Sequence, residues 1–209
     1  GALRLAAPDI TTLAAFADLP IAAGGAFADA RFNTRRSGAG AEVKLTASDL
    51  RFDQAIADIG AVTIDADVNW NGRAATAEAA VSGPFGQPVR ARITAPLVPS
   101  GGPAPTVPQN GPLSGALDWQ GEIGDLWALV PAPGHVLSGQ TTVALEILGT
   151  VAEPDVGGSV ALTNGRYENL DVGAILTDLT ATSRIAPGGA FAVDLTADDG
   201  ASGQVAATV

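Results

Sequence analysis

Apolar and polar residues alternate along most of this chain with a period of two. In the clearest run, residues 62–70, single polar residues separate Val62, Ile64, Ala66, Val68 and Trp70. Successive side chains of a β-strand point to opposite faces, whereas one face of a helix repeats about every 3.6 residues. The run therefore predicts a strand with one apolar face and one polar face.

The same alternation recurs in both halves of the chain and predicts a long antiparallel sheet. About a dozen strands at a spacing of ~4.8 Å would give a sheet roughly 55–65 Å long, with one whole side apolar. We expect the following residues to line that apolar face: Val43, Leu45, Val62, Ile64, Val68, Trp70, Val89, Ile93, Leu117, Trp119, Val143, Leu145, Ile147, Val160, Leu162, Val193, Leu195 and Val205.

Turn-forming residues separate the alternating runs. These residues tolerate a positive φ or preset a bend, so we expect them to connect strands. They are Asn71-Gly72, Ser82-Gly83-Pro84, Asn164-Gly165, Pro187-Gly188-Gly189 and Asp199-Gly200. Three short stretches that interrupt the alternation, 10–17, 53–59 and 125–130, are typical of single helical turns.

Residues 96–112 are rich in proline and glycine and divide the chain into two similar halves. Proline cannot donate a hydrogen bond to a β-ladder, so this stretch predicts an exposed loop. Because both halves have the same strand pattern, we expect residues 1–209 to form one continuous sheet with a long loop at its edge. The chain starts at Gly1 and stops at Val209 within an alternating run, which favours an excised segment of a longer protein.

The composition excludes several classes of function. With 22 acidic and 11 basic residues, the net charge of −11 is opposite to what a nucleic-acid reader or a polybasic membrane-docking surface needs. Cysteine is absent, so neither a disulfide nor a thiolate metal site can form. No apolar run approaches the roughly 18 residues that a transmembrane helix needs.

No group of residues indicates catalysis, a metal or a cofactor. The only histidine, His135, follows a turn-like Pro-Ala-Pro-Gly stretch, and we expect it to be an exposed turn residue. The aspartate pairs Asp65 with Asp67 and Asp194 with Asp198 are explained by the polar faces of their strands. Packing likewise accounts for the three tryptophans. The chain is therefore expected not to be an enzyme.

The apolar residues are mostly short. Hydrophobic residues make up 46% of the chain, but aromatics make up only 5% and methionine is absent. A closed sandwich about 10 Å thick is normally filled by bulky side chains, yet alanine recurs on these faces, as at Ala75, Ala77 and Ala79. Either a second sheet covers the apolar face, or the sheet curls into an open trough. Acyl chains would fit such a trough, because they need aliphatic walls and few polar contacts.

Residues 113–182 resemble the TamB family, the large periplasmic component of the bacterial translocation and assembly module. The strings that carry the resemblance are GALDWQG at 115–121, IGDLWALVPAPG at 123–134, LSG at 137–139, LEILGTVAEPDVGG at 145–158 and TNGRYENLDVG at 163–173. The first half is similar to the family through the text at 13–20, LAAFADLP.

The resemblance implies an all-β fold, in which an elongated antiparallel sheet curls into a U-shaped trough with an aliphatic interior. It implies residence in the periplasm, an inner-membrane anchor, and partnership with an outer-membrane barrel of the BamA type (TamA-like). It also implies a hydrophobic groove for phospholipids that move between the inner and outer membranes, and a role in outer-membrane protein assembly. The family offers no catalytic residue or cofactor to transfer. Neither the anchor nor the barrel-contacting segment is recognised in this chain, which leaves direct contact with the barrel open.

Two other functions remain open from the sequence. A chaperone-like scaffold would pair its open sheet edge with β-strands of nascent outer-membrane proteins. A closed-core structural or adhesin domain would bury the apolar face against a second sheet. The raw edges of a long sheet also predict end-to-end association of the chain.

Overall fold

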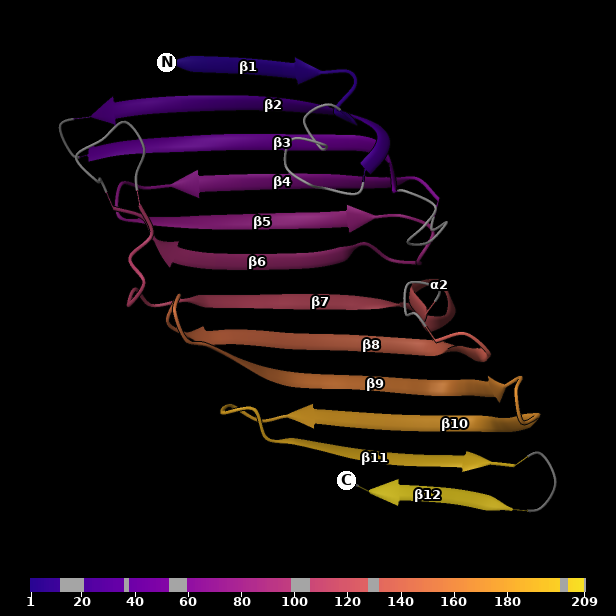
Figure 1. Cartoon of the computed structure of the whole chain (residues 1–209). Helices are drawn as coiled ribbons and strands as arrows, with labels where there is room; N and C mark the ends of the chain where they lie inside the picture. The colour runs from indigo at the N-terminus through magenta and orange to yellow at the C-terminus, as the bar shows by residue number, and fades with distance from the viewer. Residues whose placement is uncertain are drawn as a thin grey trace.

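The structure is a computed structural model that describes residues 1–11, 21–35, 38–52, 60–98, 106–127, 132–199 and 203–208. These residues form a single sheet of twelve strands (Figure 1). Each strand pairs antiparallel with the strand before it and the strand after it in the sequence, so the order in the sheet is the order along the chain. The prediction of an all-β, antiparallel fold is confirmed, and the sheet is open rather than closed into a barrel.

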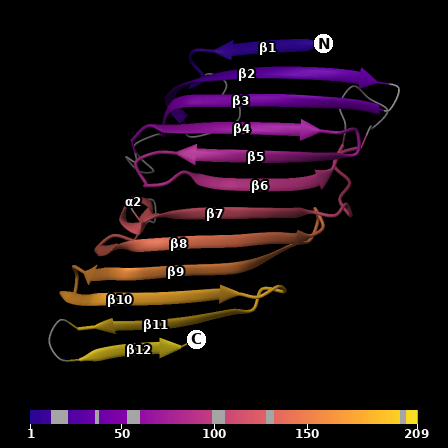
Figure 2. The ribbon, with the colours of Figure 1, turned by 180° about the vertical axis from the view of Figure 1, so that it is seen from behind.

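The strands vary in length from five to sixteen residues. They are β1 (Ala2–Ala7), β2 (Ile21–Arg35), β3 (Gly38–Phe52), β4 (Val62–Trp70), β5 (Ala74–Ser82), β6 (Val89–Pro96), β7 (Ser114–Glu122), β8 (His135–Gly149), β9 (Pro154–Asn169), β10 (Ala174–Ile185), β11 (Phe191–Asp198) and β12 (Gln204–Thr208). Figure 2 shows the same stack from behind, with β1 and β12 as its outermost strands.

One short helix, α2 (Ile123–Trp127), lies between β7 and β8. It begins two residues before the helical turn predicted at 125–130, of which 128–130 fall outside the described residues. The turn predicted at 53–59 is wholly outside them, and so is most of the one at 10–17. In the described part of the chain, no helix has the length and hydropathy needed to cross a membrane.

The sheet continues across the proline-rich stretch. Strand β6 pairs with β7 from Arg90 opposite Asp118 to Thr94 opposite Ser114. Just beyond β6, Val98 and Thr106 exchange two backbone hydrogen bonds of 2.9 and 2.8 Å, so the chain leaves and re-enters at one end of the sheet. Residues 99–105 are outside the described residues.

Most of the predicted turn sequences connect strands. Residues 71–73 join β4 to β5, residues 83–88 join β5 to β6, and residues 186–190 join β10 to β11. The prediction for Asn164-Gly165 is wrong, because both residues lie inside β9. Asn164 has a φ of 51°, and the small polar side chain that suits a left-handed turn also suits a β-bulge. Asp199 follows β11, while Gly200 is outside the described residues.

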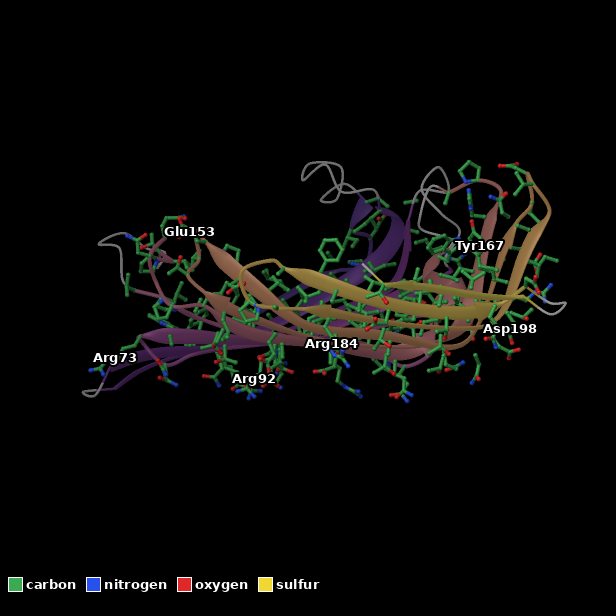
Figure 3. The ribbon with its side chains drawn as sticks, turned by 90° about the horizontal axis from the view of Figure 1, so that it is seen from below. Arg73, Arg92, Glu153, Tyr167, Arg184 and Asp198 are labelled. Carbon is green, nitrogen blue, oxygen red and sulfur yellow. The ribbon has the colours of Figure 1, made fainter. Side chains whose placement is uncertain are left out.

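Bulges lie near one end of the strands in two parts of the sheet, β2 to β4 and β8 to β11, whereas β4 to β8 pair without a register shift. The pairing register shifts in β2 with β3, β3 with β4, β8 with β9, β9 with β10 and β10 with β11. Three non-glycine residues with positive φ, Asp49, Asn164 and Asp178, lie at or beside these shifts. A bulge bends its strand and increases the local twist. Figure 3 shows the result: the sheet is curved, and strand ends rise on the side where Tyr167 lies, away from Arg92 and Arg184.

The most deeply buried apolar side chains gather beside the bulges. One cluster contains Ile10, Ala47, Leu50, Val62 and Phe85. The other contains Leu162, Leu179 and Ala197. The bend lets neighbouring side chains approach one another, which a flat single sheet does not allow. These clusters hold the curvature in place.

The residue at the β9 bulge tests whether the backbone there requires a positive φ. We expect Asn164→Ala to lower the free energy of unfolding by about 1 kcal/mol, because a Cβ without a compensating polar group disfavours the left-handed region. Asn164→Gly removes that penalty and is expected to stay within about 0.5 kcal/mol of the parent. Urea unfolding of both variants measures the difference. Equal stability of the two would contradict the bulge conformation.

Candidate functional site

The register of the strands places every predicted apolar position on a single face of the sheet. Residues that lie opposite each other in an antiparallel pair point to the same side. Val43 is opposite Val68, Ile64 is opposite Val81, and Val143 is opposite Val160. Followed from strand to strand, these pairs bring together all the residues expected from the alternation. We call this surface the apolar face and the opposite side the polar face.

One row of the apolar face runs across eleven strands without a polar side chain. Each member is opposite the next in the strand pairing. The row consists of Leu5, Ala28, Leu45, Ala66, Ala79, Ala91, Leu117, Leu145, Gly158, Ile185 and Phe191. Ten strand intervals of ~4.8 Å make this row about 48 Å long.

Several apolar-face residues were not among those predicted. Leu3, Leu5, Val81, Val156 and Ile185 share the face by register. Leu3 and Leu5 flank Arg4, and Val81 continues the spacing of the alanines before it. The period-two pattern therefore contained the signal needed to find them.

The apolar face is open to solvent within the part of the chain that the structure describes. At several positions along it the side chains remain substantially exposed: Leu5 is 58% exposed, Leu45 38%, Ile93 40% and Phe191 63%. Three residues predicted to line the face, Val62, Trp119 and Leu162, are instead buried. Residues between the two sheets of a sandwich would be buried. The described residues form one sheet, so a closed core of two sheets is not what they build.

The side chains in the middle of the apolar face are small, so they project less from the sheet than those around them. Strands β5 and β6 contribute mainly alanine, with Ala77 opposite Ile93 and Ala79 opposite Ala91. Glycine continues this low relief on β7, where Gly115 lies opposite Ile93 and Ile147. Larger side chains stand on the flanking strands, among them Trp70 on β4 and Trp119 on β7. Such a surface offers a shallow depression lined by methyl groups and almost no hydrogen-bonding group.

The polar face carries cross-strand ion pairs. Lys44 Nζ lies 2.6 Å from Asp67, and Arg92 lies 3.2 Å from Glu78. The hydrogen bond from Lys44 to Asp67, together with the charge of that carboxylate, raises the pKa of Lys44 above its usual value. Asp65 accepts a hydrogen bond from Thr46 at 2.8 Å, so both aspartates of this pair bind side chains of β3 on the polar face. Among the described residues, no three acidic or histidine side chains converge as a metal site.

The prediction that His135 is an exposed turn residue is wrong. His135 is the first residue of β8, is half-buried, and its Nδ1 lies 2.6 Å from the hydroxyl of Tyr167 on β9. Trp127 of α2 donates its indole N–H to the backbone oxygen of His135 at 3.1 Å. His135 and Tyr167 are 32 residues apart in the sequence, so no local sequence motif predicts their contact. Figure 3 shows Tyr167 at the raised end of the sheet.

Each tryptophan has a structural partner, in keeping with the packing role expected for it. Trp70 donates its indole N–H to the carbonyl of Leu97 at 2.9 Å, and Trp119 donates to the carbonyl of Phe85 at 3.3 Å. Trp119 is also buried. Buried indoles usually satisfy their N–H in this way.

Two leucines on β3 test whether the apolar face is uncovered. Leu50 is 2% exposed in the cluster beside the bulge, so Leu50→Ala is expected to lower the free energy of unfolding by about 2–5 kcal/mol. Leu45→Ala removes the same atoms from the open face and should cost less than about 1 kcal/mol. Urea denaturation compares the two. A loss at Leu45 as large as that at Leu50 would mean that another layer covers the face.

The chain matches no protein-family model, no curated protein and no solved structure. The resemblance of residues 113–182 to the TamB family therefore stays an expectation, and the text at 13–20 lies outside the described residues.

Proposed function

We propose that the apolar face holds the hydrocarbon chains of phospholipids, as a non-catalytic segment of a path between the inner and outer membranes. The observation that carries the proposal is the uncovered apolar row across eleven strands. Water disfavours a contiguous apolar surface of that extent on an isolated protein. An occupant that is itself apolar removes this cost.

The chemistry of the face suits acyl chains better than other occupants. Burial of one methylene group contributes about 0.8 kcal/mol to the free energy of binding, and this contribution does not depend on the orientation of the group. A flexible acyl chain therefore needs only a continuous aliphatic surface. Alanine and glycine in the middle of the sheet leave room for such a chain. A peptide or sugar ligand would need polar partners, and the row from Leu5 to Phe191 contains none.

The shape of the sheet supports an open trough. Bulges raise the strand ends on the apolar side, while charged residues such as Arg92 and Arg184 point to the convex side (Figure 3). A U-shaped trough with an aliphatic interior would keep acyl chains inside and leave the head groups in water at the lip. Lipids would then move along the stacking direction of the strands without a chemical step.

The setting that we propose is the periplasm, which matches the resemblance of the second half to TamB. In a longer protein, successive segments of this kind would bridge the space between the membranes. We propose that this longer protein also supports outer-membrane protein assembly and contacts a BamA-type barrel.

Crosslinking from adjacent residues of β8 tests which face meets lipid. A photoreactive residue at Leu145 lies on the apolar face, and one at Ala144 lies on the polar face. In bacterial cells we expect phospholipid adducts from position 145 and few or none from position 144, read by mass spectrometry. Native mass spectra of the purified protein should also contain bound phospholipid. Equal labelling at both positions, or none at Leu145 with a lipid-free spectrum, would overturn the proposal.

A charge on the apolar face should interrupt lipid binding. Ile93 is exposed and lies between Ala77 and Gly115, so Ile93→Asp can be accommodated without a clash. We expect it to reduce the amount of bound phospholipid at least about tenfold, because a carboxylate desolvated by acyl chains is costly. The control Ala116→Asp adds the same charge on the polar face of the neighbouring strand and should leave lipid binding unchanged. Urea unfolding of both variants verifies that each sheet is intact.

A further inference from the structure

The charged residues are distributed unevenly along the sheet. Residues 1–98 contain 9 basic and 10 acidic residues, a net charge of −1, whereas residues 99–209 contain 2 basic and 12 acidic residues, a net charge of −10. The apolar row from Leu5 to Phe191 crosses both parts. A lipid that moves along this row would therefore pass from a nearly neutral part of the protein to a strongly acidic one.

Many of the acidic residues in the second part lie beside the apolar face, at the ends of the strands. We call the first and last two residues of each strand, together with the loops that join the strands, the lips of the sheet. Glu153 lies in the loop 150–153 at one lip, and Asp171 lies in the loop 170–173 at the opposite lip, and both are exposed. Figure 3 labels Glu153 at its lip and Tyr167 near the other. The described acidic residues at the lips of β7 to β12 are Glu122, Glu153, Asp155, Glu168, Asp171, Asp198 and Asp199.

The two basic residues of the second part do not offset this charge. Arg166 Nε lies 2.6 Å from Glu168, so the charges of these two neighbours balance each other. Arg184 points to the convex side, away from the apolar face (Figure 3). The first part differs, because the exposed Arg73 lies in the loop 71–73, at the same lip as Glu153. A head group at the lips of β7 to β12 therefore meets a net negative charge.

The apolar face determines where the head group of a bound lipid lies. Acyl chains on the apolar face leave the head group in water at a lip. A charge in water acts over about 8–10 Å at moderate salt, so the head group need not touch a carboxylate to be affected by it. A phospholipid with a net negative charge is repelled there, whereas a zwitterionic phospholipid can turn its ammonium group toward the carboxylates.

We infer that the apolar face along β7 to β12 selects zwitterionic phospholipids with an ammonium group and disfavours anionic phospholipids. The inference rests on the proposed function, because the acyl chains bring the head group to the lips. The carboxylates do not form a binding site of their own; they act on a ligand that the apolar face holds. An exposed charge pair contributes little by itself, so the selectivity is a sum over several side chains and weakens as salt is added.

Competition between two lipids with identical acyl chains tests the selectivity. The purified protein is incubated with vesicles that contain equal amounts of phosphatidylethanolamine, which is zwitterionic, and phosphatidylglycerol, which is anionic. It is then separated from the vesicles, and the bound lipids are measured by mass spectrometry. We expect phosphatidylethanolamine to be enriched about fivefold or more at about 20 mM salt, and less than about twofold at about 0.5 M salt.

Two pairs of lysine variants separate the charge of the lips from the charge of the whole protein. The double variant Glu153→Lys with Asp171→Lys places a cation at each lip, and we expect it to lower the enrichment at least about fivefold at low salt. The control Asp118→Lys with Glu146→Lys changes the net charge equally, but both residues are exposed on the polar face. We expect the control to keep the enrichment of the parent within about twofold, because the sheet separates these side chains from the bound head groups.

The amount of bound lipid and its composition report on different proposals. Bound lipid in the vesicle ratio, or enriched in phosphatidylglycerol, overturns the selectivity and leaves the lipid-binding face in place. An equal change in both double variants also overturns it, because the net charge of the protein would then set the ratio. A parent protein that binds neither lipid overturns both proposals. Circular dichroism verifies that the variants fold, and the salt dependence of the parent tests the selectivity even if one of them does not.

Discussion

The backbone hydrogen bonds between strands that are neighbours in sequence are the interaction on which the rest of this structure depends. All twelve strands are joined in this way, and each strand contacts mainly the strand before it and the strand after it. Without a second layer in the described residues, burial alone cannot hold the sheet together, and most of its deeply buried apolar side chains belong to two clusters beside the bulges. A sheet of this kind behaves almost as a one-dimensional array, in which each strand is stabilised by its immediate neighbours.

The register that makes the sheet also makes its two surfaces. Because opposite residues share a side, a period of two in every strand adds up to one apolar face and one charged face. The charged face is satisfied by water and by pairs such as Lys44 with Asp67. The apolar face has no such partner, and exposed residues along it, such as Leu5, Leu45 and Ile93, are the physical reason for proposing a hydrocarbon occupant. The residues that specify the fold are thus the same residues that form the proposed binding surface.

The sequence by itself determined which residues share a face, because alternation is a local property that strand geometry converts directly into sidedness. The runs around Val62 and Val143 and the turn at Asn71-Gly72 needed no long-range information. Asn164 was misassigned because a hairpin turn and a bulge demand the same left-handed backbone, and only the pairing of β9 with both neighbours distinguishes them. The contact of His135 with Tyr167 depends on a register set over the whole length of β8 and β9. Whether the apolar face is covered was decided by the tertiary structure alone, because an alternating strand looks the same in a closed sandwich as in an open, curved sheet.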